Sequence, residues 1–253
     1  MKAGIIAAGI GERLTAGGDL TPKPLVSIGG EPMIGRLIRL IAEAGIASLC
    51  CIINEESAAT GEYLLSRAWP IPLQLLRKTT DNSMESLFSL APLLEGAPFA
   101  LFTVDAVFRA LTLKRFLAAA AALPFAEGVL ALTRFCDDEK PLRVAMDRMR
   151  KISRMGETRD IGHSVTAGFY RFEPSVFDFV AQARARGLSA LRQFLCFLLE
   201  AGYGLYGISA AKTIDVDRPE DVVEAENYLK DHEGARNDSA WCLPGENIFS
   251  RQG

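Results

Sequence analysis

The first 105 residues alternate short apolar runs with amphipathic segments, and this alternation constrains the fold more than any other feature of the sequence. The run Lys2–Ala7 is continuously small and apolar, as expected for a strand that is buried in a parallel sheet. The segment Met33–Ala44 instead places Ile34, Leu37 and Ile41 on one face of a helix. The same pattern predicts further strands at Leu49–Ile53, Leu73–Leu76 and Phe99–Val104, and helices at Ser57–Arg67 and Met84–Leu94. This order predicts a three-layer α/β fold, with an open, mostly parallel sheet between helices.

The second half of the chain is less regular. The predicted helices are Thr112–Leu123, Ser175–Arg186, Ala190–Ala201 and Pro219–Leu229, and the predicted strands are Val129–Thr133, Val165–Phe172, Tyr203–Ile208 and Thr213–Val216. The segment Cys136–His163 is charged and poor in apolar residues, so no element is assigned to it. We expect one domain over residues 1–229 and a polar tail over residues 230–253.

A glycine-rich loop follows the first predicted strand. Gly9 and Gly11 allow backbone amides to approach a ligand closely, and phosphate is the natural ligand of such a loop. The loop lacks the third glycine of a dinucleotide fingerprint and the Gly-Lys-Ser/Thr of a Walker loop. Arg13 adds a cation, and Lys23 lies between two prolines that restrict its backbone. A Gly-x-Gly alone is typical of a ligand-free turn, but its combination with two cations favours a polyphosphate.

Three spaced elements of the first 45 residues resemble the nucleotidyltransferase superfamily that includes sugar-1-phosphate nucleotidylyltransferases and phosphocholine cytidylyltransferases. They are the segments Ala7-Ala8-Gly9-Ile10-Gly11-Glu12-Arg13-Leu14, Pro22-Lys23-Pro24-Leu25 and Gly29-Gly30-Glu31-Pro32-Met33-Ile34. The resemblance implies a Rossmann-like domain in which residues 1–110 bind the nucleotide, residues 111–212 bind the acceptor, and residues 213–229 return to the metal. It also implies that Ala7, Ala8, Gly9, Gly11 and Glu12 line the nucleotide. Arg13 would hold the β- and γ-phosphates, and Lys23 would reach the reacting phosphates. Glu12 departs from the small or hydroxyl residue that is more usual in the family.

Carboxylates follow two of the predicted strands. Asp105 ends a buried strand, at the edge where open α/β sheets bind ligands. The resemblance implies that Asp105 binds Mg²⁺ or Mn²⁺, although Val104 stands where the family usually has Gly. It further implies that Asp215 or Asp217 shares this metal, with Asp217 preferred. Asp217 with Glu220 also forms a pattern typical of a helix capping box.

Two short segments concern the substrates. Asn82 and Ser83 precede a predicted helix at a place where the family contacts base or ribose, and their context resembles the phosphocholine-type enzymes. Thr166 and Gly168 lie in a segment that resembles the strand on which sugar-handling members seat the acceptor. The structural alternatives are an N-cap for the first segment and a core strand, with Gly168 at a bulge, for the second.

The resemblance implies an enzyme that transfers a nucleotidyl group. The phosphate of a phosphorylated small molecule, a sugar-1-phosphate above all, would attack the α-phosphorus of an NTP and release pyrophosphate. A phosphate monoester with a second pKa near 6 is largely ionised at neutral pH, so no strong base is needed. Neither His163 nor His232 belongs to a Ser/His/Asp or Cys/His grouping.

Four alternatives stay open. They are a phosphocholine- or phosphonate-type cytidylyltransferase, a molybdopterin-type nucleotidyltransferase, a non-catalytic nucleotide-sensing module and a dinucleotide-dependent oxidoreductase. The missing third glycine weighs against the last of these.

Composition limits the other partners. The 28 Lys plus Arg and 31 Asp plus Glu residues give a net charge of −3, which argues against a general nucleic-acid binder. The longest uncharged stretches, such as Phe116–Ala126, fall short of the roughly 18 apolar residues of a membrane span. No signal-peptide core precedes Glu12, so we expect a cytoplasmic protein. The five cysteines show no metal-ligand spacing and are expected to be reduced, mostly core thiols.

Overall fold

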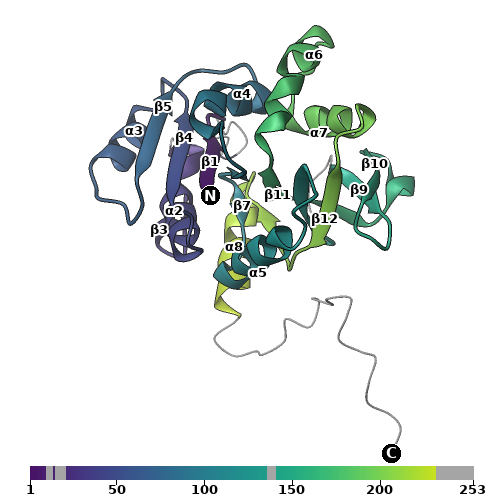
Figure 1. Cartoon of the computed structure of the whole chain (residues 1–253). Coiled ribbons are helices and arrows are strands. Elements are labelled where there is room, and N and C mark those ends of the chain that lie inside the picture. The colour runs from purple at the N-terminus through teal and green to yellow at the C-terminus, as the bar shows by residue number, and fades with distance from the viewer. Residues whose placement is uncertain (10–13, 15–20, 136–140, 232–253) are drawn as a thin grey trace, which may run out of the picture.

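A computed structural model describes residues 1–9, 14, 21–135 and 141–231 (Figure 1). Its centre is a nine-stranded sheet with helices on both faces, the three-layer α/β architecture that the sequence predicts. The strand order along the main path is β10-β9-β11-β6-β1-β4-β5, and β8 and β12 extend the sheet beside β11.

The first half of the chain forms the parallel part of the sheet. Its strands are β1 (Lys2–Ala7), β4 (Ser48–Ile53), β5 (Leu73–Arg77) and β6 (Phe99–Thr103), and its helices are α2 (Met33–Glu43), α3 (Ala58–Leu65) and α4 (Ser83–Leu94). Strand β1 pairs in parallel with β4 on one side and with β6 on the other, and β4 pairs in parallel with β5. All seven elements lie within a few residues of the predicted ranges, because buried apolar runs and amphipathic periodicity are strong local signals.

The second half of the chain completes the sheet through a strand that runs antiparallel to β6. Strand β11 (Ser164–Phe172) runs antiparallel to β6 and to β8 (Gly128–Thr133), and β12 (Leu205–Ser209) runs parallel to β8. The segment left unassigned by the sequence holds β9 (Arg143–Met146) and β10 (Ile152–Gly156), which pair as an antiparallel hairpin. Most residues of this hairpin are at least partly exposed, so its strands lack the apolar runs that identify the buried ones.

The helices cover the two faces of the sheet (Figure 1). Helices α2, α3 and α5 (Ala110–Ala121) pack on one face in a cluster that includes Ile38, Phe102 and Phe116. Helices α4, α6 (Val180–Ala185) and α7 (Leu191–Glu200) pack on the other face. The single helix predicted over Ser175–Arg186 is wrong in its first half, which is a 3₁₀ helix over Pro174–Phe179 that leads into α6.

A third hydrophobic cluster joins an early segment of the chain to the last described helix. Helix α8 (Pro219–Lys230) packs with β2 (Ser27–Ile28), which pairs with β3 (Glu31–Pro32). A two-stranded sheet of β7 (Ala106–Val107) and β13 (Ile214–Asp215) lies beside it. No helix in the described ranges has both the length and the apolar character to cross a membrane.

Candidate active site

The carboxyl ends of β1 and β6 place the start of the glycine loop beside Asp105. Ile6 is in register with Thr103, and the Ile6 carbonyl accepts a hydrogen bond from the Val104 N–H at 3.2 Å. Ala7 and Ala8 are buried, whereas Gly9 is exposed, and a Cβ built on it would meet no atom of the described residues within 4 Å. The described part of the chain therefore leaves the backbone at Gly9 uncovered. The predicted nucleotide contacts Gly11, Glu12 and Arg13 lie outside the described residues.

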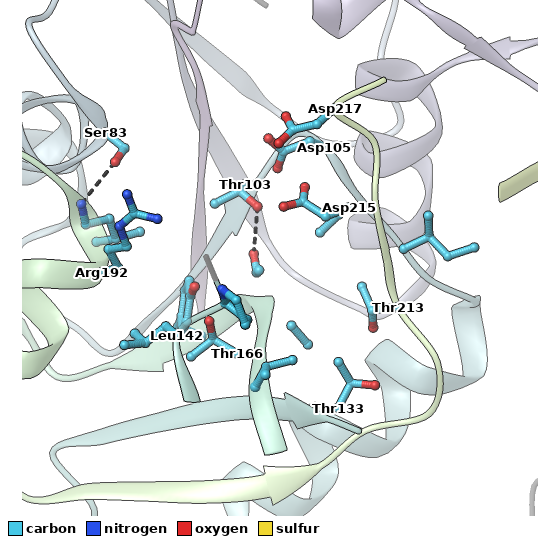
Figure 2. A pocket seen from close by; sticks show the side chains of 18 of the residues that line it. Ser83, Thr103, Asp105, Thr133, Leu142, Thr166, Arg192, Thr213, Asp215 and Asp217 are labelled. Atoms are coloured by element: carbon cyan, nitrogen blue, oxygen red, sulfur yellow. Dashed lines mark hydrogen bonds between the residues drawn. The ribbon is translucent and has the colours of Figure 1, made fainter. Parts of the chain in front are cut away.

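Strand pairing assembles an acidic cluster from distant parts of the chain. Asp215 is in register with Ala106, and the Val216 N–H donates to the Asp105 carbonyl at 3.1 Å. Carboxylate oxygens of Asp105, Asp215 and Asp217 lie within 4.8 Å of one another. The three predicted acids thus lie together (Figure 2). Both Asp215 and Asp217 are close enough to Asp105 to share a metal with it, so distance alone does not distinguish between them.

Lys23 lies between two of these acids. Its Nζ atom is 2.7 Å from Asp105 Oδ2 and 2.5 Å from Asp217 Oδ1. Lys23 begins a 3₁₀ turn over Lys23–Leu25 between Pro22 and Pro24, closed by a hydrogen bond from the Leu25 N–H to the Pro22 carbonyl. The Lys23 side chain is 9% exposed, while those of Asp105 and Asp217 are 24% and 27% exposed. The two carboxylates therefore keep surface that a ligand can reach.

The electrostatics follow from this contact. Burial by itself lowers the pKa of Lys23, but attraction and hydrogen bonds to Asp105 and Asp217 outweigh burial and hold the pKa well above its ordinary value. Burial likewise raises the pKa of Asp105, and the nearby Lys23 charge more than reverses this, so the pKa lies below its usual range. At neutral pH the site thus contains the Lys23 ammonium and the ionised carboxylate of Asp105.

The sequence prediction of a capping box at Asp217 and Glu220 is wrong by one residue. The Asp221 carboxylate accepts hydrogen bonds from the N–H groups of Asp217 at 2.8 Å and Arg218 at 2.7 Å. Pro219 occupies the first helical position, where its missing N–H is no loss, so Arg218 becomes the N-cap residue. The Asp221 carboxylate therefore accepts hydrogen bonds from the backbone N–H groups at the start of α8. The Asp217 carboxylate bonds Lys23 instead.

The donor set of this cluster fits a hard divalent cation. Three carboxylates offer only oxygen atoms, which Mg²⁺ and Mn²⁺ prefer over nitrogen and sulfur ligands. The Lys23 ammonium between two of them is further evidence that the position accommodates positive charge. Asp105, Asp215 and Asp217 can therefore hold a divalent cation together with oxygen ligands from a substrate.

A cleft of about 440 Å³ opens beside the acidic cluster. Figure 2 shows Asp105, Asp215 and Asp217 on one side of the cleft and Arg192 on another, with Thr103 between them and Thr166 and Thr133 below. The cleft is lined by both polar and apolar residues: Ser83, Thr103, Asp105, Ala106, Thr133, Phe135, Pro141, Leu142, Val165, Thr166, Ala167, Gly168, Tyr170, Ala190, Leu191, Arg192, Leu195, Thr213, Ile214, Asp215, Asp217, Arg218 and Asp221. Its size suits a ligand of a few hundred daltons.

The two predicted acceptor residues lie in this cleft. Thr166 and Gly168 belong to β11, whose register against β8 shifts between Thr166 and Tyr170, as expected for a bulge at Gly168. Gly168 has φ +79°, and its carbonyl accepts a hydrogen bond from the Thr103 hydroxyl at 3.3 Å. This hydrogen bond thus joins the bulge of β11 to the last residue of β6, two positions before Asp105.

Asn82 and Ser83 have structural contacts at the start of α4. The Asn82 side chain caps the helix by accepting from the Glu85 N–H at 3.0 Å, which was the structural alternative for this segment. The Ser83 hydroxyl accepts from the Leu191 N–H at 3.0 Å and also lines the cleft. Of the two residues, only Ser83 lies on the cleft wall.

Sequence reasoning missed Arg192 and Arg218, the two arginines of the cleft wall. Arg192 lies in the first turn of α7, and its Nε atom is 3.5 Å from Glu157 Oε1. A cation near a helix N-terminus opposes the helix dipole. An arginine in the first turn of a predicted helix was therefore the signal in the sequence that could have marked Arg192 as a candidate site residue.

The chain matches the family model "Nucleotidyl transferase" over residues 2–232. A probable mannose-1-phosphate guanylyltransferase 1 from Oryza sativa subsp. japonica is 27% identical over 201 residues, which are 70% of this chain and 51% of that protein. An N-acetylmuramate alpha-1-phosphate uridylyltransferase from Neisseria meningitidis serogroup B is 35% identical over 115 residues, 42% of this chain and 47% of that protein. The chain spans about half the length of the curated relatives it matches.

Solved structures share the fold. The inositol-1-phosphate CTP transferase from T. maritima superposes with a TM-score of 0.76 at 19% identity, covering 91% of this chain and 96% of that chain. A putative glucose-1-phosphate thymidylyltransferase from Bacillus anthracis gives a TM-score of 0.77 at 16% identity with the same coverage. These neighbours confirm the predicted three-layer architecture.

Proposed function

The chain belongs to the nucleotidyl transferase family, and we propose that it transfers a nucleoside monophosphate from an NTP to a sugar-1-phosphate and releases pyrophosphate. One observation carries this proposal above all. The cluster of Lys23, Asp105 and Asp217 lies at one side of a cleft whose other wall carries Arg192. A reaction that brings two phosphorylated substrates together needs positive charge for both of them, on opposite sides of the point of attack.

The nucleotide is proposed to bind over the carboxyl ends of β1 and β6. The backbone at Gly9 is exposed among the described residues, and in the sequence Arg13 continues the loop with a cation for the β- and γ-phosphates. Lys23 is proposed to contact the phosphates at the reacting centre. Its fixed backbone and long stem allow the ammonium to reach a ligand without movement of the main chain.

Asp105 and Asp217 are proposed to hold Mg²⁺ or Mn²⁺, with Asp215 as a third oxygen donor. A divalent cation bound there neutralises charge on the triphosphate oxygens as the negative charge of pyrophosphate develops. The Asp221 cap supports this role, because it spares the Asp217 carboxylate from the helix amides.

The acceptor is proposed to lie in the cleft between Arg192 and the acidic cluster, against Thr166 and Gly168. Arg192 would bind the acceptor phosphate, for which its planar fork of donors is well suited. One oxygen of that ionised phosphate attacks the α-phosphorus, the bond from this phosphorus to the bridging oxygen breaks, and that oxygen leaves with pyrophosphate. No protein base has to accept a proton in this step, because the attacking phosphate is already an anion.

A second candidate is supported by the Asn82-Ser83 segment, which resembles that of phosphocholine-type enzymes. A 2-aminoethylphosphonate cytidylyltransferase from Lancefieldella rimae is 32% identical over 102 residues, 38% of this chain and 39% of that protein. In this alternative the same carboxylates and lysine serve a CTP, and the acceptor is a small phosphorylated or phosphonylated amine. The acidic residues of the cleft would then face its positive charge.

Pyrophosphate release tests both candidates. The purified chain is incubated with Mg²⁺, each of the common NTPs, and a panel of sugar-1-phosphates, phosphocholine and 2-aminoethylphosphonate. Release with one NTP and a sugar-1-phosphate is expected, and release with CTP and an amine acceptor only would favour the second candidate. An Asp105→Asn variant serves as the matched control for contaminating activity. No release in any pairing, together with no NTP bound in calorimetry, would exclude nucleotidyl transfer.

A further inference from the structure

The contact between Lys23 and the two acids has a second implication. The Nζ atom lies within hydrogen-bond distance of one oxygen of Asp105 and one oxygen of Asp217 at the same time. These are two of the three carboxylates that can hold a divalent cation. The ammonium and such a cation therefore need the same side chains.

The charges of the cluster show how the ammonium balances the acids. Three carboxylates lie within 4.8 Å of one another, and the Lys23 ammonium is a cation that contacts two of them. Like charges at such short range repel strongly in a partly buried site. Lys23 thus stabilises the arrangement of Asp105 and Asp217 when no other cation is present, and it also lowers the attraction of the cluster for a second cation.

The Lys23 backbone is held in place, but its side chain can rotate to bring the ammonium to another anion. The backbone is fixed between Pro22 and Pro24, and the Lys23 carbonyl accepts from the Val26 N–H at 3.2 Å. The four-carbon stem can still rotate, as in lysines generally. Asp105 and Asp217 line the cleft and are 24% and 27% exposed, so the ammonium is bonded to two carboxylates that a ligand can reach.

We propose that Lys23 is an internal counter-cation that occupies Asp105 and Asp217 in the ligand-free protein and has to leave them when they bind a divalent cation. In the presence of an NTP, the phosphate oxygens offer Lys23 another anionic partner. Lys23 therefore couples the two ligands: it weakens binding of the metal alone and favours binding of metal and NTP together. By linkage, the metal raises NTP affinity by the same factor. The NTP part of this inference rests on the proposed function, whereas the metal part does not.

The direct test is Mn²⁺ binding to the nucleotide-free protein, measured by electron paramagnetic resonance. Three proteins are compared: the unaltered chain, Lys23→Met, and Lys114→Met as a matched control on the exposed side of α5. Lys23→Met is expected to bind Mn²⁺ at least about tenfold more tightly, because one charge-assisted hydrogen bond of the competing lysine corresponds to about that factor and Lys23 makes two of them. Lys114→Met is expected to bind like the unaltered chain. Equal affinity in all three proteins, or no Mn²⁺ binding to any, would overturn the proposal.

A second measurement needs no variant and so remains valid if Lys23→Met does not fold. Lysine acylation of the unaltered protein is followed by peptide mass spectrometry, with EDTA or with Mn²⁺ present. The Lys23 amine, buried between two carboxylates, is expected to react slowly in EDTA and several-fold faster with Mn²⁺, while Lys114 reacts equally in both. Unchanged Lys23 labelling would contradict the proposal.

The two ideas can fail separately. Tighter Mn²⁺ binding by Lys23→Met without any pyrophosphate release by the unaltered chain would support the counter-cation role and refute the proposed function. Pyrophosphate release combined with unchanged Mn²⁺ affinity and labelling would refute the counter-cation role alone.

Discussion

Gly168 and Ala106 approach each other so closely that a Cβ atom built on Gly168 would lie 2.6 Å from the Ala106 Cβ. The same atom would lie 2.7 Å from the Thr103 hydroxyl oxygen. Thr103 and Ala106 stand on either side of Asp105 in the chain. The bulge of β11 therefore packs against the residues that flank Asp105, the carboxylate proposed to bind the metal.

We expect Gly168→Ala to reduce both stability and activity. Its left-handed φ of +79° costs about 1–2 kcal/mol for alanine, and the close contact adds about 1–3 kcal/mol of overpacking. Gly45→Ala is the matched control, because Gly45 has φ +80° but open space around its Cβ position. Chemical denaturation measures the free energy of unfolding of both variants. Equal destabilisation of the two would show that the contact with Ala106 is unimportant.

We expect Asp217→Asn to lower kcat more than Asp215→Asn, and each to weaken activation by Mg²⁺. The Asp217→Asn substitution removes the ion pair with Lys23 as well as the charge of a proposed metal ligand. We therefore expect kcat of this variant to fall about a hundredfold or more. Asp160→Asn, in an exposed ion pair with Arg154, serves as the control. Titration of the initial rate with Mg²⁺ gives both kcat and the metal requirement. A larger effect of Asp215→Asn would reverse the assignment.

We expect Arg192→Ala to raise KM for the acceptor about tenfold or more while KM for the NTP changes little, because one charge-assisted contact to the acceptor phosphate is lost. Arg186→Ala is the matched control: it removes a half-exposed arginine of a similar ion pair, 2.9 Å from Glu200. Initial rates with each substrate varied in turn separate the two constants. A change confined to the NTP constant would place the nucleotide, not the acceptor, beside Arg192.

Asn82 has a cap function that can be separated from nucleotide contact. Asn82→Ala is expected to destabilise the protein by about 1 kcal/mol through loss of the α4 cap, whereas Asn82→Asp retains a capping oxygen and is expected to stay near full stability. Thermal unfolding checks this order. If Asn82→Asp is stable but has a raised KM for the NTP, the amide also contacts the nucleotide. If its KM is unchanged, Asn82 is a structural residue only.

Local signals made the first half of the fold predictable. Buried apolar runs such as Lys2–Ala7 have one stable environment, and parallel sheets place the carboxyl ends of their strands at one edge, where Asp105 was expected and lies. The hairpin of β9 and β10 was not predictable from periodicity, because its exposed strands carry no apolar pattern. Its pairing with β11 depends on contacts across the sheet.

The site residues divide in the same way. Lys23 and Asp105 follow from motif and strand order, and their 2.7 Å contact is consistent with the predicted positions. The capping residue of α8 was misplaced by one position, because the effect of Pro219 on the helix start outweighs the spacing of acidic residues. Arg192 was missed because its place on the cleft wall depends on how α7 packs against α4, which a single sequence does not reveal.

Because β7 pairs with β13, the acidic cluster exists only after segments that are far apart in the chain have come together. Lys23 and Asp217 are 194 positions apart in the chain. Asp215 reaches Asp105 through the pairing of β13, which contains Asp215, with β7, which directly follows Asp105. A growing polypeptide that has released Asp105 from the ribosome still lacks two of its three carboxylates. Affinity of the proposed metal site for a divalent cation would therefore arise only after Asp217 has been synthesised, and a metal-sensitive fluorophore would report when Asp105, Asp215 and Asp217 have come together.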